Sequence, residues 1–256
     1  MSEKILCPYC LSPLEGQRKE CPFCGKSLEN LNPPGTLPFA YLLGSRYTIG
    51  KVLQVDGEGI LYAAVENVSG FRVNIKEYLP VTLSSGRDEN LIVHPKPDSE
   101  VLFKTTRMDF ADLYKTVQRI TPATGLVAVL DVLEANGTVY AVLEVTQGIP
   151  LERYLALRSG PLLPEEARSL MQPVMEGVAA LHKIGLVHRG VAPDNIRITE
   201  GGLARLGGYA TLGLRNLGSE LKAQLYEGYS APEQYFPEQF EGRYTDVYSV
   251  AAVFYR

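Results

Sequence analysis

The stretch YTIGKVLQVDGEGILYAAVENVSGFRVNIKE, residues 47–77, decides the fold of the main part of this chain. It contains three runs rich in β-branched and aromatic residues, namely Tyr47–Val55, Gly59–Glu66 and Phe71–Glu77. Such residues favour strands, and the short Gly-, Asn- and Ser-containing segments between the runs favour tight turns. The stretch therefore predicts an antiparallel meander.

A second pair of apolar runs, residues 126–133 and 138–145, flanks the dipeptide Asn136-Gly137. Both of these residues tolerate positive φ, so the pair predicts a hairpin turn. Between the meander and the hairpin, residues 103–120 are the one stretch of this half that is long enough for a helix. We therefore expect five strands and one helix in the first half of the main domain.

The hydrophobic period changes after Gly148. From Pro164 to Gly185 apolar residues recur every three or four positions, which is typical of a buried amphipathic helix. Pro173 lies inside this stretch and is expected to kink the helix or to remove one backbone hydrogen bond. A strand-rich half followed by a helical half predicts an α+β, two-lobed fold.

The composition is that of a globular protein, because 45% of the 256 residues are hydrophobic and 21% are charged. A formal net charge of −4 gives no overall positive field that would attract nucleic acid or an anionic membrane. No apolar run approaches the roughly 18 to 20 residues needed to cross a bilayer, and Met1–Leu6 lacks the layout of a signal peptide. We expect a cytoplasmic segment without membrane contact, which could belong to a longer, membrane-anchored chain.

All four cysteines lie near the start, at Cys7, Cys10, Cys21 and Cys24. Two C-x2-C turns at this spacing can aim four thiolates at one point, the closed shell that structural Zn²⁺ prefers. Because so short a segment cannot bury a hydrophobic core, metal binding would supply the free energy that folds it. Residues 1–29 resemble a zinc ribbon.

The stretch at residues 32–38 contains three prolines and a glycine and predicts a Pro/Gly-rich linker over residues 30–45. The main domain is then expected to run from residue 46 to residue 256. A closed four-thiolate site leaves no open position for a substrate, which indicates a structural role for the ribbon. Its four basic and four acidic residues cancel, so we favour a protein partner over nucleic acid.

Three segments of the main domain carry a family resemblance. They are VNIKEYLP at residues 73–80, HRGVAPDN at residues 188–195 and GYSAPEQY at residues 228–235. Together they resemble a bacterial Ser/Thr protein kinase domain, and the resemblance extends from about residue 46 to the end. It implies a β-rich N-lobe over residues 46–145 and a C-lobe over residues 146–256. Because the sequence stops inside what resembles the central C-lobe helix, we expect this lobe to be incomplete.

The same resemblance identifies positions where side chains used in catalysis are replaced. Gly190 stands where kinases carry the aspartate that accepts the proton of the substrate hydroxyl, and Ala192 replaces a lysine that contacts phosphate. Gly208 stands where the D-F-G aspartate holds Mg²⁺. General acid–base catalysis typically contributes about 10²- to 10⁴-fold, and metal ions add several kcal/mol.

The sequence therefore predicts a catalytically inactive pseudokinase that acts as a regulatory or scaffolding module for a protein partner. The alternative is an active Ser/Thr protein kinase, or another ATP-dependent transferase, with a rearranged site. A further alternative is a docking protein whose ribbon binds nucleic acid or a large assembly.

If ATP or ADP binds, the resemblance implies contacts from five positions. They are Gly59 in the phosphate loop, Lys76, Asp112 as the helix partner of Lys76, Glu144 at the hinge, and Asn195 as a metal ligand. The alternative role for Lys76 is a structural ion pair with Asp112 or with Glu77. In addition, Asp56 places negative charge where the loop backbone should cradle phosphates.

Other positions are expected to support the fold. The resemblance implies that Asp246 anchors the backbone of the loop at residues 188–195, and that His188 and Tyr209 pack in the core. Arg189 is expected to pair with a phosphate or to form a plain salt bridge. Glu233 is expected to lack a partner.

Overall fold

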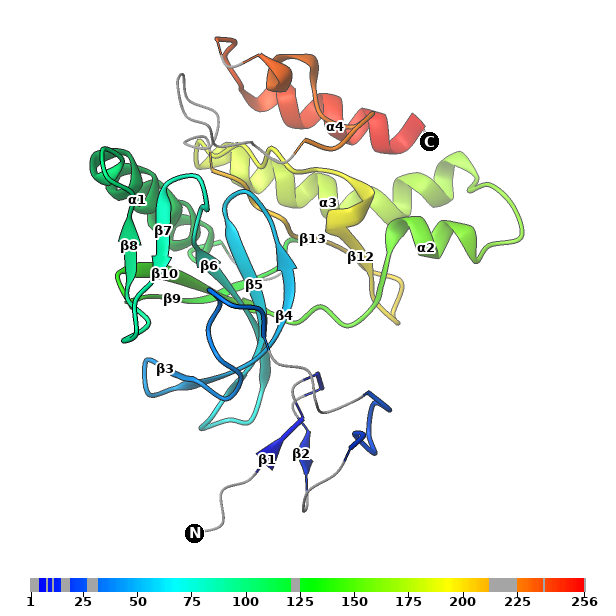
Figure 1. Cartoon of the computed structure of the whole chain (residues 1–256). Coiled ribbons are helices and arrows are strands. Elements are labelled where there is room, and N and C mark those ends of the chain that lie inside the picture. Colours follow the sequence, from blue (N-terminus) through cyan, green and yellow to red (C-terminus); the bar gives the residue numbers. More distant parts are fainter. Residues whose placement is uncertain are drawn as a thin grey trace. The chain divides into compact units, whose positions relative to one another are not determined.

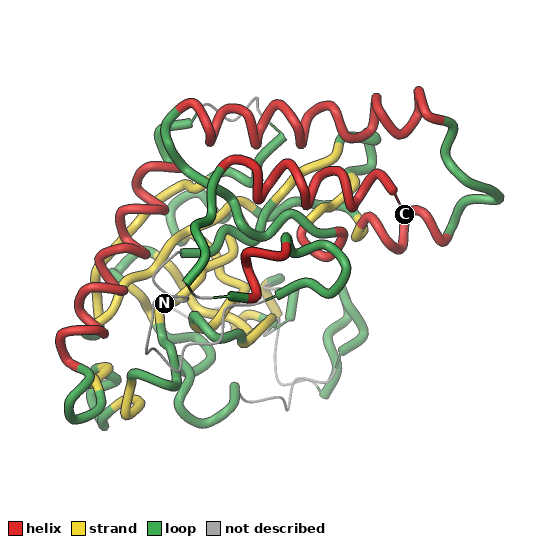
Figure 2. Tube along the Cα trace, turned by 90° about the horizontal axis from the view of Figure 1, so that it is seen from above, coloured by secondary structure: helices red, strands yellow, loops and turns green. Residues whose placement is uncertain are grey.

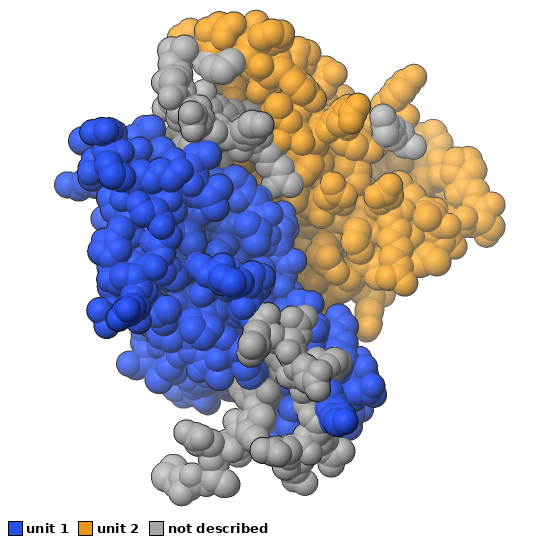
Figure 3. Space-filling view, in the orientation of Figure 1, with its two compact units in different colours: residues 1–111, 130–145 blue, residues 112–129, 146–256 orange. Residues whose placement is uncertain are grey.

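The computed structural model describes residues 5–7, 9–10, 12–14, 19–26, 32–120, 125–211, 225–236 and 238–255. It divides into two compact units, which Figure 3 shows in different colours. Unit 1 comprises Met1–Ala111 and Leu130–Val145, and unit 2 comprises Asp112–Val129 and Thr146–Arg256.

Unit 1 is built on a six-stranded sheet (Figure 1). Its strands, in spatial order, are β3 (Leu42–Leu43), β4 (Tyr47–Val55), β5 (Gly59–Glu66), β6 (Arg72–Tyr78), β10 (Thr138–Glu144) and β9 (Val129–Ala135). The meander β4–β5–β6 is antiparallel, as predicted. Tyr62, Ile75 and Val142 are direct neighbours across β5, β6 and β10, and all three are fully buried. This stripe forms the centre of the unit 1 core.

The turn between β9 and β10 confirms the expected hairpin, since Asn136 and Gly137 both have positive φ, at 51° and 72°. A second hairpin, β7 (Ser84–Arg87) with β8 (Val93–Pro95), was not predicted. It touches the first one, because a Cβ on Gly137 would lie 2.7 Å from the carbonyl oxygen of Val93. The sequence of β7, Ser-Ser-Gly-Arg, has none of the β-branched residues that signal a strand.

Helix α1 (Glu100–Val117) follows this hairpin, close to the expected helix at 103–120. Glu100 lies in its first turn, where an acidic side chain favours the helix dipole. Phe103 and Phe110 contact the ring of Tyr78 with centroids 5.5 and 5.4 Å apart. These contacts attach the first part of α1 to the end of β6.

The segment before β4 differs from the expected spacer. Leu37 is fully buried, and its backbone amide donates to the hydroxyl of Tyr62 at 3.0 Å. The side chain of Asn32 donates to the carbonyl oxygen of Gly50 at 2.8 Å and accepts from the amide of Val52 at 3.1 Å. This segment thus contacts the sheet on both sides of Pro33 and Pro34, through Asn32 and Leu37, and continues into the edge strand β3.

Unit 2 contains most of the helices. They are α2 (Leu151–Ala156), α3 (Pro164–Lys183), α4 (Arg243–Tyr255) and the 3-10 turns η1 (Pro193–Asn195) and η3 (Pro232–Tyr235). A three-stranded sheet joins β11 (Ile149–Pro150), β12 (Ile196–Ile198) and β13 (Ala204–Leu206) in that order. Helices α3 and α4 lie side by side (Figures 1 and 2).

Helix α3 confirms the amphipathic prediction. Met171, Val174, Val178 and Leu181 are buried at the expected spacing, and the helix continues through Pro173. No described helix has the combined length and apolar character that a membrane span requires.

Candidate functional site

The four cysteines converge on one point in unit 1. Strands β1 (Ile5–Leu6) and β2 (Pro13–Leu14) pair beside the first C-x2-C turn. The sulfurs of Cys7, Cys10, Cys21 and Cys24 all lie within 4.8 Å of one another. The Sγ–Sγ distances are 3.7 Å for Cys7–Cys24 and 3.5 Å for Cys10–Cys21. Zn–S bonds of about 2.3 Å in a tetrahedron place sulfurs about 3.8 Å apart, so the cluster fits one zinc ion.

Side chains of the sheet contact this cysteine segment. The ammonium of Lys51 on β4 lies 4.3 Å from the ring centroid of Tyr9, within the first C-x2-C turn. The guanidinium of Arg72 on β6 donates to the hydroxyl of Ser12 at 3.2 Å. The residues next to the cysteines therefore contact these two strands.

The turn between β4 and β5 is closed by Asp56. One carboxylate oxygen, Oδ1, accepts from the backbone amides of Glu58 and Gly59, each at 3.0 Å. The amide of Asp56 in turn donates to the carbonyl oxygen of Gly59 at 2.9 Å. The second oxygen, Oδ2, forms an ion pair with the ammonium of Lys76 on β6. Gly59 and Lys76, both predicted nucleotide contacts, thus meet at one carboxylate.

Within unit 1, Lys76 pairs with Asp56 and not with Glu77, one of its two expected structural partners. Glu77 is fully buried and instead forms an ion pair with Arg87 of β7 and accepts from the hydroxyl of Tyr62 at 2.8 Å. Burial and the nearby Glu77 charge raise the pKa of Tyr62. This buried ion pair was not predicted, although a glutamate inside the apolar strand β6 is a sequence signal for a buried partner. Asp112 is exposed on α1.

Two further predicted positions have clear structural surroundings. A Cβ on Gly59 would lie 1.9 Å from the carbonyl oxygen of Glu77, so close strand packing alone requires glycine there. Glu144 ends β10 and is partly buried.

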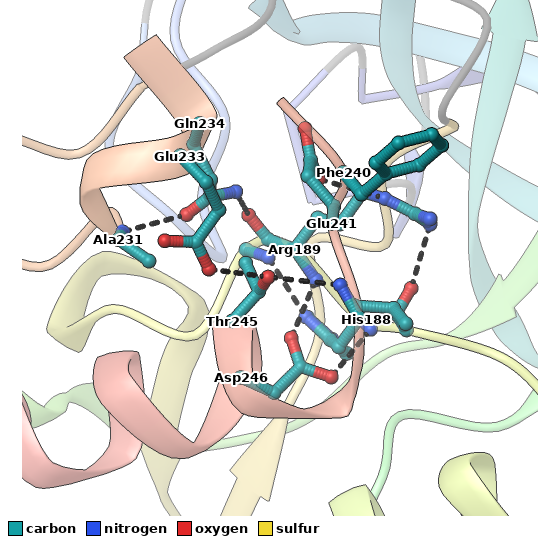
Figure 4. Close-up of polar contacts among 12 residues, drawn as sticks. His188, Arg189, Ala231, Glu233, Gln234, Phe240, Glu241, Thr245 and Asp246 are labelled. Atoms are coloured by element: carbon teal, nitrogen blue, oxygen red, sulfur yellow. Dashed lines mark hydrogen bonds and ion pairs between the residues drawn. The ribbon is translucent and has the colours of Figure 1, made fainter. Parts of the chain in front are cut away.

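In unit 2, Asp246 holds the backbone of the loop at residues 188–195 (Figure 4). Its carboxylate is fully buried and accepts from the amides of His188 and Arg189, both at 2.8 Å. It also contacts Nε2 of His182 at 2.8 Å. Arg189 has a φ of 66°, a conformation that is costly for a residue with a side chain. The predicted anchoring role of Asp246 is therefore confirmed.

A second set of contacts ties the segment at residues 231–241 to this loop (Figure 4). Arg189 forms a salt bridge with Glu241 at 3.0 Å, and Gln234 donates to the carbonyl oxygen of Arg189 at 3.1 Å. The hydroxyl of Thr245 donates to Glu233 at 2.7 Å. The expectation that Glu233 lacks a partner was wrong, because the threonine one residue before Asp246 supplies it.

His188 is a core residue, as expected. It is 1% exposed, and its ring centroid lies 5.0 Å from that of Tyr209, whose hydroxyl donates to the carbonyl oxygen of Val127 at 2.7 Å. Burial lowers the pKa of His188 to about 4. The imidazole is therefore neutral at pH 7, and its Nδ1 accepts from the amide of Gly190 at 3.2 Å.

Asn195 packs directly against Gly190 and Gly208, the two glycines at positions where the resemblance implies aspartates. Its Nδ2 donates to the carbonyl oxygen of Gly190 at 2.7 Å and to the hydroxyl of Tyr226 at 2.8 Å. A Cβ on Gly208 would lie 2.3 to 2.4 Å from three side-chain atoms of Asn195. A Cβ on Gly190 would lie 2.5 Å from the carbonyl oxygen of Gly208. Ala192, the third replaced position, is fully buried at the start of η1.

A curled antiparallel sheet in one unit, and an aspartate-anchored loop among helices in the other, define a kinase-like fold. The family model described as protein kinase domain matches residues 104–256, and the chain belongs to this family. Membership implies ATP and a divalent metal ion as reaction partners.

Several relatives are similar to this chain. Serine/threonine-protein kinase PknL of Mycobacterium tuberculosis is 34% identical over 133 residues, which cover 51% of this chain and 33% of PknL. Serine/threonine-protein kinase PrkC of Bacillus subtilis is 30% identical over 110 residues, covering 40% of this chain and 17% of PrkC. The chain thus spans a third or less of these curated relatives. The solved structure described as PpkA-294 apo form is 28% identical, with a TM-score of 0.71, and covers 86% of this chain and 78% of its own.

These comparisons correct the expectation of an inactive, non-enzymatic module. The matched region includes Gly190, Ala192 and Gly208, and the relatives PknL and PrkC are named Ser/Thr protein kinases. They favour the alternative of an active kinase with a rearranged site. Three replaced side chains, at positions 190, 192 and 208, had led to that expectation although Lys76 and Asn195 are retained.

Proposed function

We propose that the chain is an ATP-dependent Ser/Thr protein kinase with a rearranged site, whose partner is a protein substrate. The match of residues 104–256 to the protein kinase domain carries this proposal. The loop held by Asp246 supports it, because an anchored backbone keeps Asn195 in a fixed place. Since ATP is a cytoplasmic co-substrate, we expect the domain to act in the cytoplasm.

Asn195 is suited to hold the divalent metal. The carbonyl oxygen of Gly190 can only accept a hydrogen bond, so the amide nitrogen of Asn195 must face it. This fixes the amide oxygen Oδ1 on the other side, and no donor among the described residues reaches that atom. A hard amide oxygen is a ligand type that Mg²⁺ and Mn²⁺ accept.

Lys76 is suited to contact the phosphates, because its ammonium is already paired with an anion. Phosphoryl transfer depends mainly on positioning and on neutralising charge, so a kinase can tolerate the lack of a strong base at position 190. That lack is expected to slow turnover by about 10²- to 10⁴-fold. We therefore propose a slow kinase.

The test is transfer of radiolabelled phosphate from ATP to the chain itself and to generic protein substrates, with Mg²⁺ or Mn²⁺. Lys76→Ala and Asn195→Ala should each reduce transfer at least tenfold, whereas Lys104→Ala, at an exposed position of α1, should leave it unchanged. Transfer by the unaltered chain that does not exceed that of Lys76→Ala would refute the proposal.

We further propose that residues 1–29 form a zinc ribbon with one structural Zn²⁺. The support is the convergence of four sulfurs at a spacing that suits Zn–S bonds. Elemental analysis should find one zinc per chain, and Cys7→Ser and Cys21→Ser should each lower it well below one. A metal-free, folded chain after exposure to zinc would contradict this.

A further inference from the structure

Three hydrogen-bond donors in unit 1 converge on a single carboxylate. The amides of Glu58 and Gly59 point at Oδ1 of Asp56, and the ammonium of Lys76 pairs with Oδ2. Successive backbone amides next to a lysine form a typical binding site for an anionic group such as phosphate. The β4–β5 turn is therefore an anion site that the chain fills with its own side chain.

This arrangement is well shielded from water. The Lys76 side chain is 9% exposed and that of Asp56 is 15% exposed. The turn is held in shape by the hydrogen bond from the Asp56 amide to the Gly59 carbonyl oxygen, and by the close approach of Gly59 to β6. Because the backbone contacts of the turn do not need the carboxylate, the donors can persist when Asp56 turns away.

We propose that Asp56 is an internal competitor of the nucleotide: its carboxylate occupies the anion site, and the phosphates of ATP must displace it. This inference rests on the proposed kinase function, because it assumes that Lys76 contacts phosphate. Two anions cannot share the same three donors, and both oxygens of Asp56 are already engaged. The carboxylate thus lowers the affinity for phosphates while leaving adenosine recognition unaffected.

The decisive experiment is calorimetric titration of the full chain with ATP, ADP and adenosine. Asp56→Asn removes the charge at nearly constant shape and should tighten ATP binding on the order of 10- to 100-fold, without changing the affinity for adenosine. Asp56→Gly is a second variant, which suits a turn and also removes the carboxylate. The matched control is Asp131→Asn, because Asp131 also pairs with a cation of the same unit, Arg46. It should leave ATP affinity unchanged.

A second experiment measures the reactivity of the Lys76 amine in the absence of nucleotide. An amine-acylating reagent, quantified by mass spectrometry, should label Lys76 faster in Asp56→Asn than in the unaltered chain, since the ion pair protects the amine. ATP should slow the labelling again. This measurement reports on the ion pair even if no phosphate is transferred.

The outcomes separate the two proposals. Equal or weaker ATP binding by both Asp56 variants, in a chain that transfers phosphate, would overturn the competitor while the kinase function stands. Faster labelling of Lys76 with no nucleotide binding in any variant would overturn both. Tighter ATP binding together with faster labelling of Lys76 would establish the competitor.

Discussion

Two aspartates, one in each unit, form the same kinds of contact but play different structural roles. Asp56 accepts from the amides of Glu58 and Gly59 and pairs with Lys76. Asp246 accepts from the amides of His188 and Arg189 and contacts His182. The difference lies in sequence separation, since the amides are two or three residues away for Asp56 and 57 or 58 for Asp246. A carboxylate that closes its own turn can be exchanged for a ligand, whereas one that joins distant segments is part of the fold.

Removal of the Asp246 carboxylate, which joins distant segments, should have the largest effect on stability. Asp246→Ala leaves two buried amides unpaired, and we expect the free energy of unfolding to fall by about 3–5 kcal/mol. Urea denaturation measures this. Asp194→Ala, at an exposed position of the same loop, is the control and should change stability by less than about 0.5 kcal/mol. Similar losses for both variants would contradict the assigned anchor.

A methyl group next to Asn195 should have the next largest effect. Gly208→Ala places a Cβ in contact with Asn195 at a φ of 73°, and we expect a loss of about 2–3 kcal/mol. Gly202→Ala, at a φ of 75° with no atom within 4 Å, carries only the backbone cost and should lose about 1 kcal/mol. Differential scanning calorimetry of both variants isolates the contact with Asn195. Equal losses would show that this contact contributes nothing.

Acidification should lower the free energy of unfolding, because His188 is buried in its neutral form. Burial lowers the pKa of His188 to about 4, below the value near 6.5 expected in the unfolded chain, so protons bind the unfolded state first. Stability is therefore lost as the pH falls from about 6.5 towards 4, with a loss of about 2 kcal/mol between pH 7 and pH 5. Urea denaturation at the two pH values tests this. His188→Phe should show a smaller loss over the same range.

Removal of the Asp56 charge should have the smallest effect on the free energy of unfolding. Asp56→Asn keeps an oxygen for the turn amides and loses the charge of a largely buried ion pair, so we expect a loss of about 1–2 kcal/mol, smaller than that of Asp246→Ala. Thermal unfolding of Asp56→Asn and of Asp246→Ala, measured under the same conditions, provides the comparison. A loss as large as that of Asp246→Ala would remove the distinction between exchangeable and structural carboxylates.

Local patterns predicted most of the secondary structure. The expected strands at 47–55 and 59–66 agree with β4 and β5 to the residue, because alternating apolar residues and glycine-containing turns encode them directly. The hairpin of β7 and β8 was missed because Ser-Ser-Gly-Arg contains no β-branched residue, and because the partner of Arg87 is Glu77 on another strand, which the hairpin's own sequence does not reveal.

Motif spacing placed the candidate site residues but not their contacts. It identified Lys76 and Asn195 by number, yet the partner of Lys76 proved to be Asp56, which had been noted only as an unfavourable charge. It also led to the expectation of inactivity, which the family comparison corrected. The role of a retained side chain depends on what replaces its neighbours, and spacing carries no such information.

The interlocking of Gly190, Gly208 and Asn195 also constrains evolution. An aspartate at position 208 would collide with Asn195, and a side chain at position 190 would collide with the backbone of Gly208. Neither position could therefore take an aspartate by a single mutation without harm, since Asn195 would have to move for position 208 and the backbone of Gly208 for position 190. The three positions are thus sterically coupled, so a substitution at one of them requires compensating changes at the others.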